Sequence, residues 1–271
     1  MKIFHLTDMH FGNTAAAFSP DDLENALQQF SRDFQLDTTY LIVTGDVTFK
    51  GQTSGYEDAT DVIKKAWIDK GGNNERFIAC PGNHDICANS FSDFDKFLYS
   101  IRRSSSLNFE NESAIVLQFQ NCVIAAINSS HHRNHQFGLV DVDQLDFALN
   151  QAALTEDDIR PRVAIIHHHV IGVDANDSST IKNALPLLHI LEENRFGLLL
   201  HGHRHALSEL VVGEHGMKVQ AGRSLAFNQP GYANGMTIHE LTADGWQSTH
   251  LFLSKDNQRP GKAIFAKQEK L

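Results

Sequence analysis

The segment RFIACPGNHD (residues 76–85) joins a short apolar run to a cluster of polar side chains. Residues 76–80 have the length and composition of a buried strand. A proline–glycine pair then ends the run, and Asn83, His84 and Asp85 follow it. In open α/β sheets, ligands bind beyond the carboxyl ends of the strands. The segment therefore predicts a buried strand that delivers amide, imidazole and carboxylate groups to a site.

Four other apolar runs end in the same way. The runs at 2–7, 40–44, 163–167 and 197–201 lead into DMH (8–10), GD (45–46), HHH (167–169) and HGHRH (201–205). At four of these five strand ends no basic residue balances the acids. Buried carboxylates without a partner are costly, so the set as a whole predicts a bound cation.

The rest of the chain alternates between strand and helix patterns. Further strands are predicted at 114–119 and 122–128, and helices at 20–35, 54–70, 91–103, 141–153 and 180–194. Residues 207–253 form short alternating runs broken by glycine, which predicts a mainly antiparallel finishing sheet. We expect one α/β domain over 1–271, with buried strands covered by helices. The polar residues 254–271 are predicted to be a tail or a surface-packed extension.

Composition excludes several classes of protein. The formal charge is −10, from 23 basic and 33 acidic residues, which disfavours bulk binding of nucleic acid. No apolar run approaches the roughly 18 residues of a membrane span. The start MKIFHL lacks the pattern of a secretion signal, so a cytoplasmic location without membrane contact is expected. Cys80, Cys87 and Cys122 are predicted to be reduced core residues. The sequence is compatible with a homodimer.

In this order, D-x-H, G-D, G-N-H-D, the histidine triplet and G-H-x-H resemble the calcineurin-like metallophosphoesterase superfamily. The resemblance extends from Asp8 to His205. Chain length, HHH and GHRH are most similar to its class III cyclic-nucleotide phosphodiesterase branch. The resemblance implies a layered α-β-β-α sandwich of two mixed sheets flanked by helices.

The resemblance also implies two divalent or trivalent metal ions that share Asp46. The first would be held by Asp8, His10, Asp46 and His205, and the second by Asp46, Asn83, His168 and His203. In the family the ligand precedes one residue and then a proline, which selects His168. Val170 stands in place of that proline, so His169 remains the alternative. Nitrogen and oxygen ligands suit Mn, Fe, Zn, Co or Ni.

A metal-bridging hydroxide would attack the phosphorus in such a site. The resemblance places His84 at the substrate, where it would stabilise the oxyanion or protonate the departing oxygen, and gives Asp85 the role of orienting His84. Two further substrate contacts are predicted. One is His135, in the loop HHRNH (131–135), and the other is Arg223, in the glycine-flanked segment that also holds Ser224 and Asn228.

The leading hypothesis is a dimetal phosphodiesterase of small phosphodiesters, with 3′,5′-cyclic nucleotides as the expected substrates. A nuclease is one alternative, and a nucleotide pyrophosphatase or phosphomonoesterase on the same centre is another. The non-enzyme alternative is a scaffold that has lost its metals, which would show decayed ligands. All seven ligand positions carry ligating residues.

Overall fold

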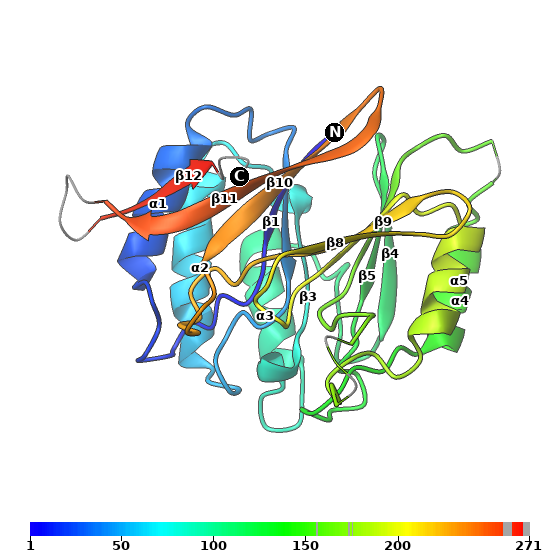
Figure 1. The fold of residues 1–271 in the computed structure, drawn as a ribbon, viewed down its shortest axis with the longest axis horizontal. Coiled ribbons are helices and arrows are strands. Elements are labelled where there is room, and N and C mark those ends of the chain that lie inside the picture. Colours follow the sequence, from blue (N-terminus) through cyan, green and yellow to red (C-terminus); the bar gives the residue numbers. More distant parts are fainter. Residues whose placement is uncertain (156, 173, 175, 257–261, 268–271) are drawn as a thin grey trace.

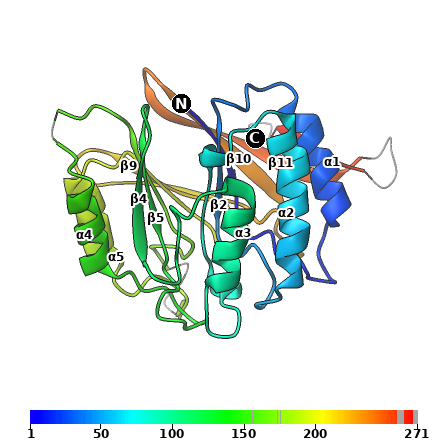
Figure 2. The ribbon, with the colours of Figure 1, turned by 180° about the vertical axis from the view of Figure 1, so that it is seen from behind.

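The chain forms two facing β-sheets with helices on the outer side of each (Figure 1). The computed structural model describes residues 1–155, 157–172, 174, 176–256 and 262–267. Seen from behind, the same four layers run from one group of helices through both sheets to the other group (Figure 2). This is the α-β-β-α arrangement of two mixed sheets that the sequence predicts.

The first sheet has the strand order β12-β11-β10-β1-β2-β3. Its strands are β1 (Lys2–Leu6), β2 (Tyr40–Thr44), β3 (Phe77–Cys80), β10 (Gly235–Thr242), β11 (Gly245–Lys255) and β12 (Ala263–Lys267). Strands β1, β2 and β3 are parallel, and β10 to β12 continue the sheet antiparallel beside β1. On the outer side lie α1 (Pro20–Ser31), α2 (Ser54–Ala66) and α3 (Ser92–Arg102) (Figure 1).

The second sheet has the strand order β4-β5-β6-β7-β9-β8. Its strands are β4 (Ala114–Gln118), β5 (Val123–Ile127), β6 (Arg162–Ile165), β7 (Leu198–His201), β8 (Ser208–Val212) and β9 (Met217–Ala221). The central strands β5, β6, β7 and β9 are parallel, and the two edge strands are antiparallel to their neighbours. Its outer side carries α4 (Val142–Gln151) and α5 (Ala184–Glu193) (Figure 1).

Residue alternation along the central strands builds the core on both faces of the second sheet. In β5, Ile124 and Ala126 join the large core that also contains the first sheet, whereas Ala125 and Ile127 join the smaller core under α4 and α5. Successive side chains of a strand point to opposite faces, so a strand buried on both faces is apolar throughout. The central strands are therefore apolar along most of their length, and the polar side chains begin in the loops that follow them.

The final third of the chain corrects one prediction. Residues 207–253 do not build a sheet of their own: β8 and β9 join the second sheet, and β10 and β11 join the first. Strand β9 is also parallel to β7. The alternating pattern identifies strands, but pairing depends on contacts far away in sequence.

The C-terminal segment, predicted to be a tail or a surface-packed extension, is in part paired with the first sheet. Residues up to Lys255 belong to β11, and β12 pairs with it, with Ala263 buried. The remaining residues of the predicted tail, 257–261 and 268–271, lie outside the described residues. Cys80, Cys87 and Cys122 are free and buried, as predicted. Within the described ranges, no helix combines the length and the apolar character needed to cross a bilayer.

Candidate metal centre

The loops that follow five parallel strands bring a group of acids, imidazoles and one amide together. We call this group the central cluster. Strands β1, β2 and β3 deliver its first members from one sheet, and β6 and β7 deliver the others from the facing sheet. Its members are Asp8, His10, Asp46, Asn83, His84, His167, His203 and His205. Because parallel strands end at the same edge, residues almost 200 positions apart become neighbours.

The backbone of these loops is unusual. Asp8, His10, Asp46, His203 and His205 all have positive φ, between 48° and 74°. This left-handed region is uncommon for residues with a side chain, and such strain tends to accumulate at functional sites.

The loops are also packed very closely. The amide of Asp8 donates to the Gly45 carbonyl at 3.1 Å, which joins the loop after β1 to the loop after β2. A side chain at Gly82 would lie 2.2 Å from Asp46 Oδ1. Glycine is therefore required where the strand end of β3 approaches the carboxylate.

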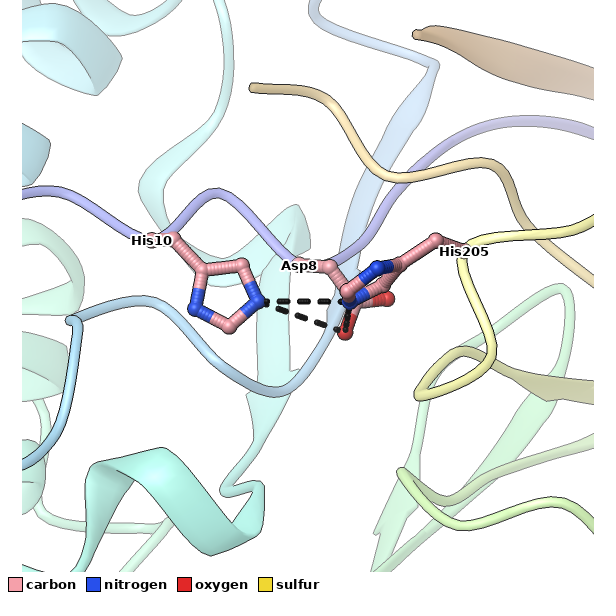
Figure 3. Close-up of side chains that lie close together, drawn as sticks. All are labelled: Asp8, His10 and His205. Carbon is pink, nitrogen blue, oxygen red and sulfur yellow. Dashed lines mark hydrogen bonds and ion pairs between the residues drawn. The ribbon is translucent and has the colours of Figure 1, made fainter. Parts of the chain in front are cut away.

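One half of the central cluster is formed by Asp8, His10 and His205 (Figure 3). Asp8 Oδ1 lies 3.3 Å from His205 Nε2 and 3.8 Å from His10 Nε2, and the two Nε2 atoms are 3.4 Å apart. The other oxygen, Oδ2, accepts from Thr7 Oγ1 at 2.7 Å and from the His203 amide at 3.0 Å. Asp8 Oδ1 is buried and has no hydrogen-bond partner among the described residues.

The other half is formed by Asp46, Asn83, His167 and His203. His167 Nε2 lies 3.1 Å from both Asn83 Oδ1 and His203 Nδ1, and 3.3 Å from Asp46 Oδ2. The same Asp46 oxygen is 3.8 Å from His10 Nε2 in the first half. Asp46 Oδ2 thus lies between the two halves, as a bridging ligand would.

Hydrogen bonds on the far side of two rings set their tautomers. His205 Nδ1 lies 2.7 Å from Gln229 Oε1, and His167 Nδ1 lies 2.8 Å from the Thr44 carbonyl. Both oxygens only accept, so each Nδ1 carries the hydrogen, and each neutral ring turns an Nε2 lone pair toward the cluster. In the neutral rings those lone pairs face oxygens that also have only lone pairs to offer, which is unfavourable unless a metal ion or a proton lies between them.

The spacing also fits a cation. Ligands about 2.1 Å from one metal ion lie about 3.0–3.4 Å apart at right or tetrahedral angles. The distances of 3.1–3.4 Å around His167 Nε2 and His205 Nε2 match this spacing. Together with the unpartnered Asp8 Oδ1, they show that the residues present fit metal ions in both halves.

Protonation of the cluster follows burial and charge. Burial lowers the pKa of His10 to about 4 despite the nearby acids, and burial together with His167 lowers the pKa of His203 to about 3. Both rings are therefore neutral and able to bind metal at pH 7. Burial also lowers the pKa of His167, but the charge of Asp46 outweighs it and raises this pKa to about 9. Without a metal this ring therefore holds a proton on both nitrogens, and a bound metal ion would displace the Nε2 proton. Burial raises the pKa of Asp46, but the neighbouring imidazoles outweigh this effect and hold it well below its usual range.

The structure corrects the choice within the histidine triplet. The sequence predicts His168 as the ligand and His169 as the alternative, but His167 reaches Asp46 and Asn83. His168 Nδ1 is 2.8 Å from Ser129 Oγ, and His169 Nε2 is 2.8 Å from Asp177 Oδ2. The family pattern identifies the ligand by its distance from the proline that follows it, and this chain has Val170 in place of that proline.

His84 lies beside both halves of the cluster. Its ligating atom is within 4.8 Å of those of His10 and Asp46, and its backbone amide donates to Asp46 Oδ1 at 2.8 Å. The Lys50 amide donates to His84 Nδ1 at 3.1 Å. The hydrogen of a neutral His84 ring is therefore on Nε2. His84 is half-buried and lies next to the shared carboxylate, and its contact with the substrate stays a prediction.

Asp85 does not have the role predicted for it. Its carboxylate accepts from the backbone amides of Val47, Thr48 and Gly82, and from the Tyr56 hydroxyl. Burial and the charge of Asp46 raise its pKa to about 7. Asp85 thus joins the loops after β2 and β3, whereas the contact that orients the His84 ring comes from the backbone of Lys50.

The two predicted substrate contacts have different positions. His135 Nδ1 lies 2.8 Å from the Asn83 carbonyl, and its own carbonyl accepts from Asn83 Nδ2 at 3.2 Å. His135 therefore borders the cluster and fixes the amide of Asn83 with Oδ1 toward His167. The Arg223 guanidinium lies over the Phe252 ring of β11, 4.7 Å from its centroid, a position that does not support a substrate contact.

Three neighbours of the cluster were not predicted. Gln229 bonds His205, and the rings of Phe49 and Phe227 lie against the imidazoles. The segment around 223–228 was singled out in the sequence for its glycines and polar residues. Its Ser224 holds the Asp8 carbonyl at 2.7 Å, Phe227 of the same segment lies against His10, and Gln229 directly after it reaches His205.

Comparisons with known proteins agree with this geometry. The profile of the calcineurin-like phosphoesterase family matches residues 1–207. A protein of Ruthia magnifica named a probable cyclic nucleotide phosphodiesterase is 20% identical over 207 residues, which cover 75% of this chain and 78% of that protein.

Solved structures show the same fold at low identity. A dimetal phosphatase from Danio rerio is 13% identical with a TM-score of 0.66, over 93% of this chain and 95% of that one. TT1561 of Thermus thermophilus is 11% identical with a TM-score of 0.59, over 92% and 98%. With the fold, the clustered ligands and the family match in agreement, the chain belongs to the calcineurin-like phosphoesterase family and is a metal-dependent phosphoester hydrolase.

Proposed function

We propose that this protein is a dimetal phosphodiesterase of small phosphodiesters, with 3′,5′-cyclic nucleotides as the substrate class. The observation that carries the proposal is the position of Asp46 Oδ2, 3.3 Å from His167 Nε2 in one half of the cluster and 3.8 Å from His10 Nε2 in the other. A carboxylate oxygen in this position could be held in common by a pair of metal ions, which would stabilise the charge that develops in phosphoester hydrolysis. The name of the Ruthia relative supports the choice of substrate class.

The residues divide into two ligand sets. Asp8, His10, Asp46 and His205 would hold one metal, and Asp46, Asn83, His167 and His203 the other. A bound pair of Mn, Fe, Zn, Co or Ni ions supplies Lewis acidity for transfer of a phosphoryl group to water. Two carboxylates against two divalent charges leave the site positive inside a chain of charge −10, so a compact phosphate would be drawn to it.

His84 would bind the reacting phosphate. Its Nε2 hydrogen is free to donate because Nδ1 already accepts from the Lys50 amide. Charge develops on the oxygens of phosphorus during the reaction, so a donor fixed beside the shared Asp46 stabilises the transition state more than the substrate. The hydrogen bond from the His84 amide to Asp46 Oδ1 fixes the position of this donor relative to the metal ligands.

A substrate panel tests the proposal. Purified protein loaded with Mn²⁺ should hydrolyse cyclic AMP and bis-p-nitrophenyl phosphate faster than p-nitrophenyl phosphate, and should leave single-stranded DNA intact. Activity on DNA but not on the small diesters would indicate a nuclease. A preference for the monoester would indicate a phosphomonoesterase, and either result would contradict the proposal.

The proposal includes a cytoplasmic location, which the three free, buried cysteines support. Fractionation of the cells that produce this protein, with a cytoplasmic marker enzyme as the control, measures its location directly. Recovery with secreted protein would contradict it.

A further inference from the structure

Two half-buried phenylalanines, Phe49 and Phe227, form an aromatic wall beside the central cluster. Phe227 lies with its ring centroid 4.7 Å from that of His10 and 4.6 Å from that of His205. Phe49 is stacked on His84 at 5.6 Å, with 25° between the planes, and lies 6.4 Å from Phe227. The two rings therefore border the imidazoles of the first half and the proposed substrate donor.

The wall is unlike the core aromatics of the chain. Phe4, Phe77, Phe91 and Phe94 are fully buried and pack against apolar neighbours, whereas Phe49 and Phe227 remain partly open to solvent. They come from different loops, one after β2 and one between β9 and β10, and both loops are fixed to the loop after β1. The Phe49 amide donates to the Phe11 carbonyl at 2.9 Å, and the Phe227 amide donates to Ser224 Oγ, which itself holds Asp8.

The position of the wall relative to His84 indicates what it would bind. A group leaving the phosphorus beside His84 would extend over Phe49, the ring on which His84 is stacked. The Lys50 ammonium lies 5.1 Å from the centroid of the Phe49 ring and adds a positive charge at the same rim. Flat, partly polar rings stack well on such surfaces, and every nucleobase has a suitable face.

We propose that the aromatic wall binds the base of a nucleotide whose phosphate lies at the central cluster. The inference rests on the proposed function for the placement of the phosphate, and it assigns the residues that would favour a nucleotide over a diester with small alkyl groups. Stacking of one base on an aromatic side chain changes affinity by about 5–150-fold. We expect a preference of that size for a ligand with a base over the same ligand without one.

Equilibrium binding tests the wall without turnover. Isothermal titration calorimetry of the Mn²⁺-loaded protein would compare adenosine 5′-monophosphate with ribose 5-phosphate, which lacks the base. The wild type should bind the nucleotide about 10-fold or more tightly. Phe49→Leu and Phe227→Leu should each lose most of this preference while retaining affinity for ribose 5-phosphate. Phe49→Tyr, which keeps the aromatic face, should keep the preference.

Phe34→Leu is the matched control. Phe34 is also half-buried and also has a lysine over its ring, Lys2 at 5.0 Å, but it packs against Phe4 away from the cluster. This variant should bind both ligands as the wild type does. Equal binding of the two ligands by the wild type, or an unchanged preference in both leucine variants, would overturn the inference. Failure to hydrolyse any small diester would contradict the proposed function alone, because the binding comparison does not depend on turnover.

Discussion

Two groups of buried histidines in this protein differ in what surrounds them. The central cluster combines imidazoles with Asp8 and Asp46, and several of its facing atoms can only accept. The second group, which we call the strand pair, consists of His5 on β1 and His239 on β10, with ring centroids 5.6 Å apart. His5 Nε2 lies 2.8 Å from Thr44 Oγ1, and His239 Nδ1 lies 3.0 Å from Ser248 Oγ.

The difference shows that buried imidazoles alone do not make a metal site. One nitrogen of each ring in the strand pair meets a hydroxyl, which can donate or accept, whereas His5 Nδ1 and His239 Nε2 have no hydrogen-bond partner among the described residues. An unpartnered imidazole nitrogen therefore does not by itself mark a metal site. Neither ring belongs to a candidate ligand group among the described residues. Carboxylate oxygens facing imidazole lone pairs are what distinguish the central cluster.

The largest effect is expected from removing the shared carboxylate. Asp46→Asn should weaken binding of both metals by more than about 100-fold, beyond the range for outer partners, because both halves lose the charge of the shared carboxylate and the second half has no other acid. Metal content by mass spectrometry, measured together with turnover, checks this. Asp244→Asn, an exposed acid in the turn between β10 and β11, is the control. Full metal content in Asp46→Asn would show that the acids are not what separates the two groups.

The triplet offers a sharper comparison between neighbouring residues. His167→Ala should reduce the bound metal from two equivalents to one, because His167 Nε2 faces Asp46 and Asn83. His168→Ala should retain two equivalents, since its Nδ1 bonds Ser129 instead. The opposite result in titrations of metal into the two variants would restore His168 as the ligand.

His84 should affect rate rather than metal binding. His84→Ala should keep both metals, and its kcat should fall by about 10²–10⁴-fold, the usual contribution of a positioned catalytic imidazole. Steady-state kinetics with metal content measured on the same sample separates the two effects. Unchanged turnover at full metal content would remove His84 from the catalytic site.

A smaller effect is expected at Gln229, which holds the far nitrogen of His205 at 2.7 Å. Gln229→Ala should weaken binding of the first metal by about 10–100-fold, because such partners fix the tautomer and orientation of a ligand. Gln229→Glu keeps an acceptor at this place and should restore most of the affinity. If alanine and glutamate behave alike in metal titrations, the contact does not orient His205.

The smallest effect concerns the strand pair. Burial, reinforced by His5, holds the pKa of His239 well below its usual value, so the unfolded chain binds a proton that the folded chain does not. Stability should therefore fall as the pH drops below about 6.5. His239→Gln removes this proton, and its free energy of unfolding should fall less between pH 6 and pH 5, by about 1 kcal/mol. Urea unfolding at the two pH values measures the difference; parallel curves would argue against a neutral, buried His239.

The sequence predicts the strands and helices of the first two thirds well because their signals are local. The strands predicted at 40–44 and 114–119 match β2 and β4 within one residue, and the helix predicted at 91–103 matches α3 within one residue at each end. The partners of the last five strands were not predictable in this way. A pairing such as Ile3 with His239 joins residues more than 200 positions apart, and no local pattern encodes it.

For the site, the sequence alone determined which strand ends carry oxygen and nitrogen ligands, because a short motif after a buried strand is a local feature. Only the tertiary structure decided which ring of the triplet turns toward Asp46, and that Asp85 and Arg223 face other partners. The physical reason is that a side chain's direction depends on contacts from distant strands. The bond between His167 Nδ1 and the Thr44 carbonyl, which selects the ring, spans 123 residues of sequence.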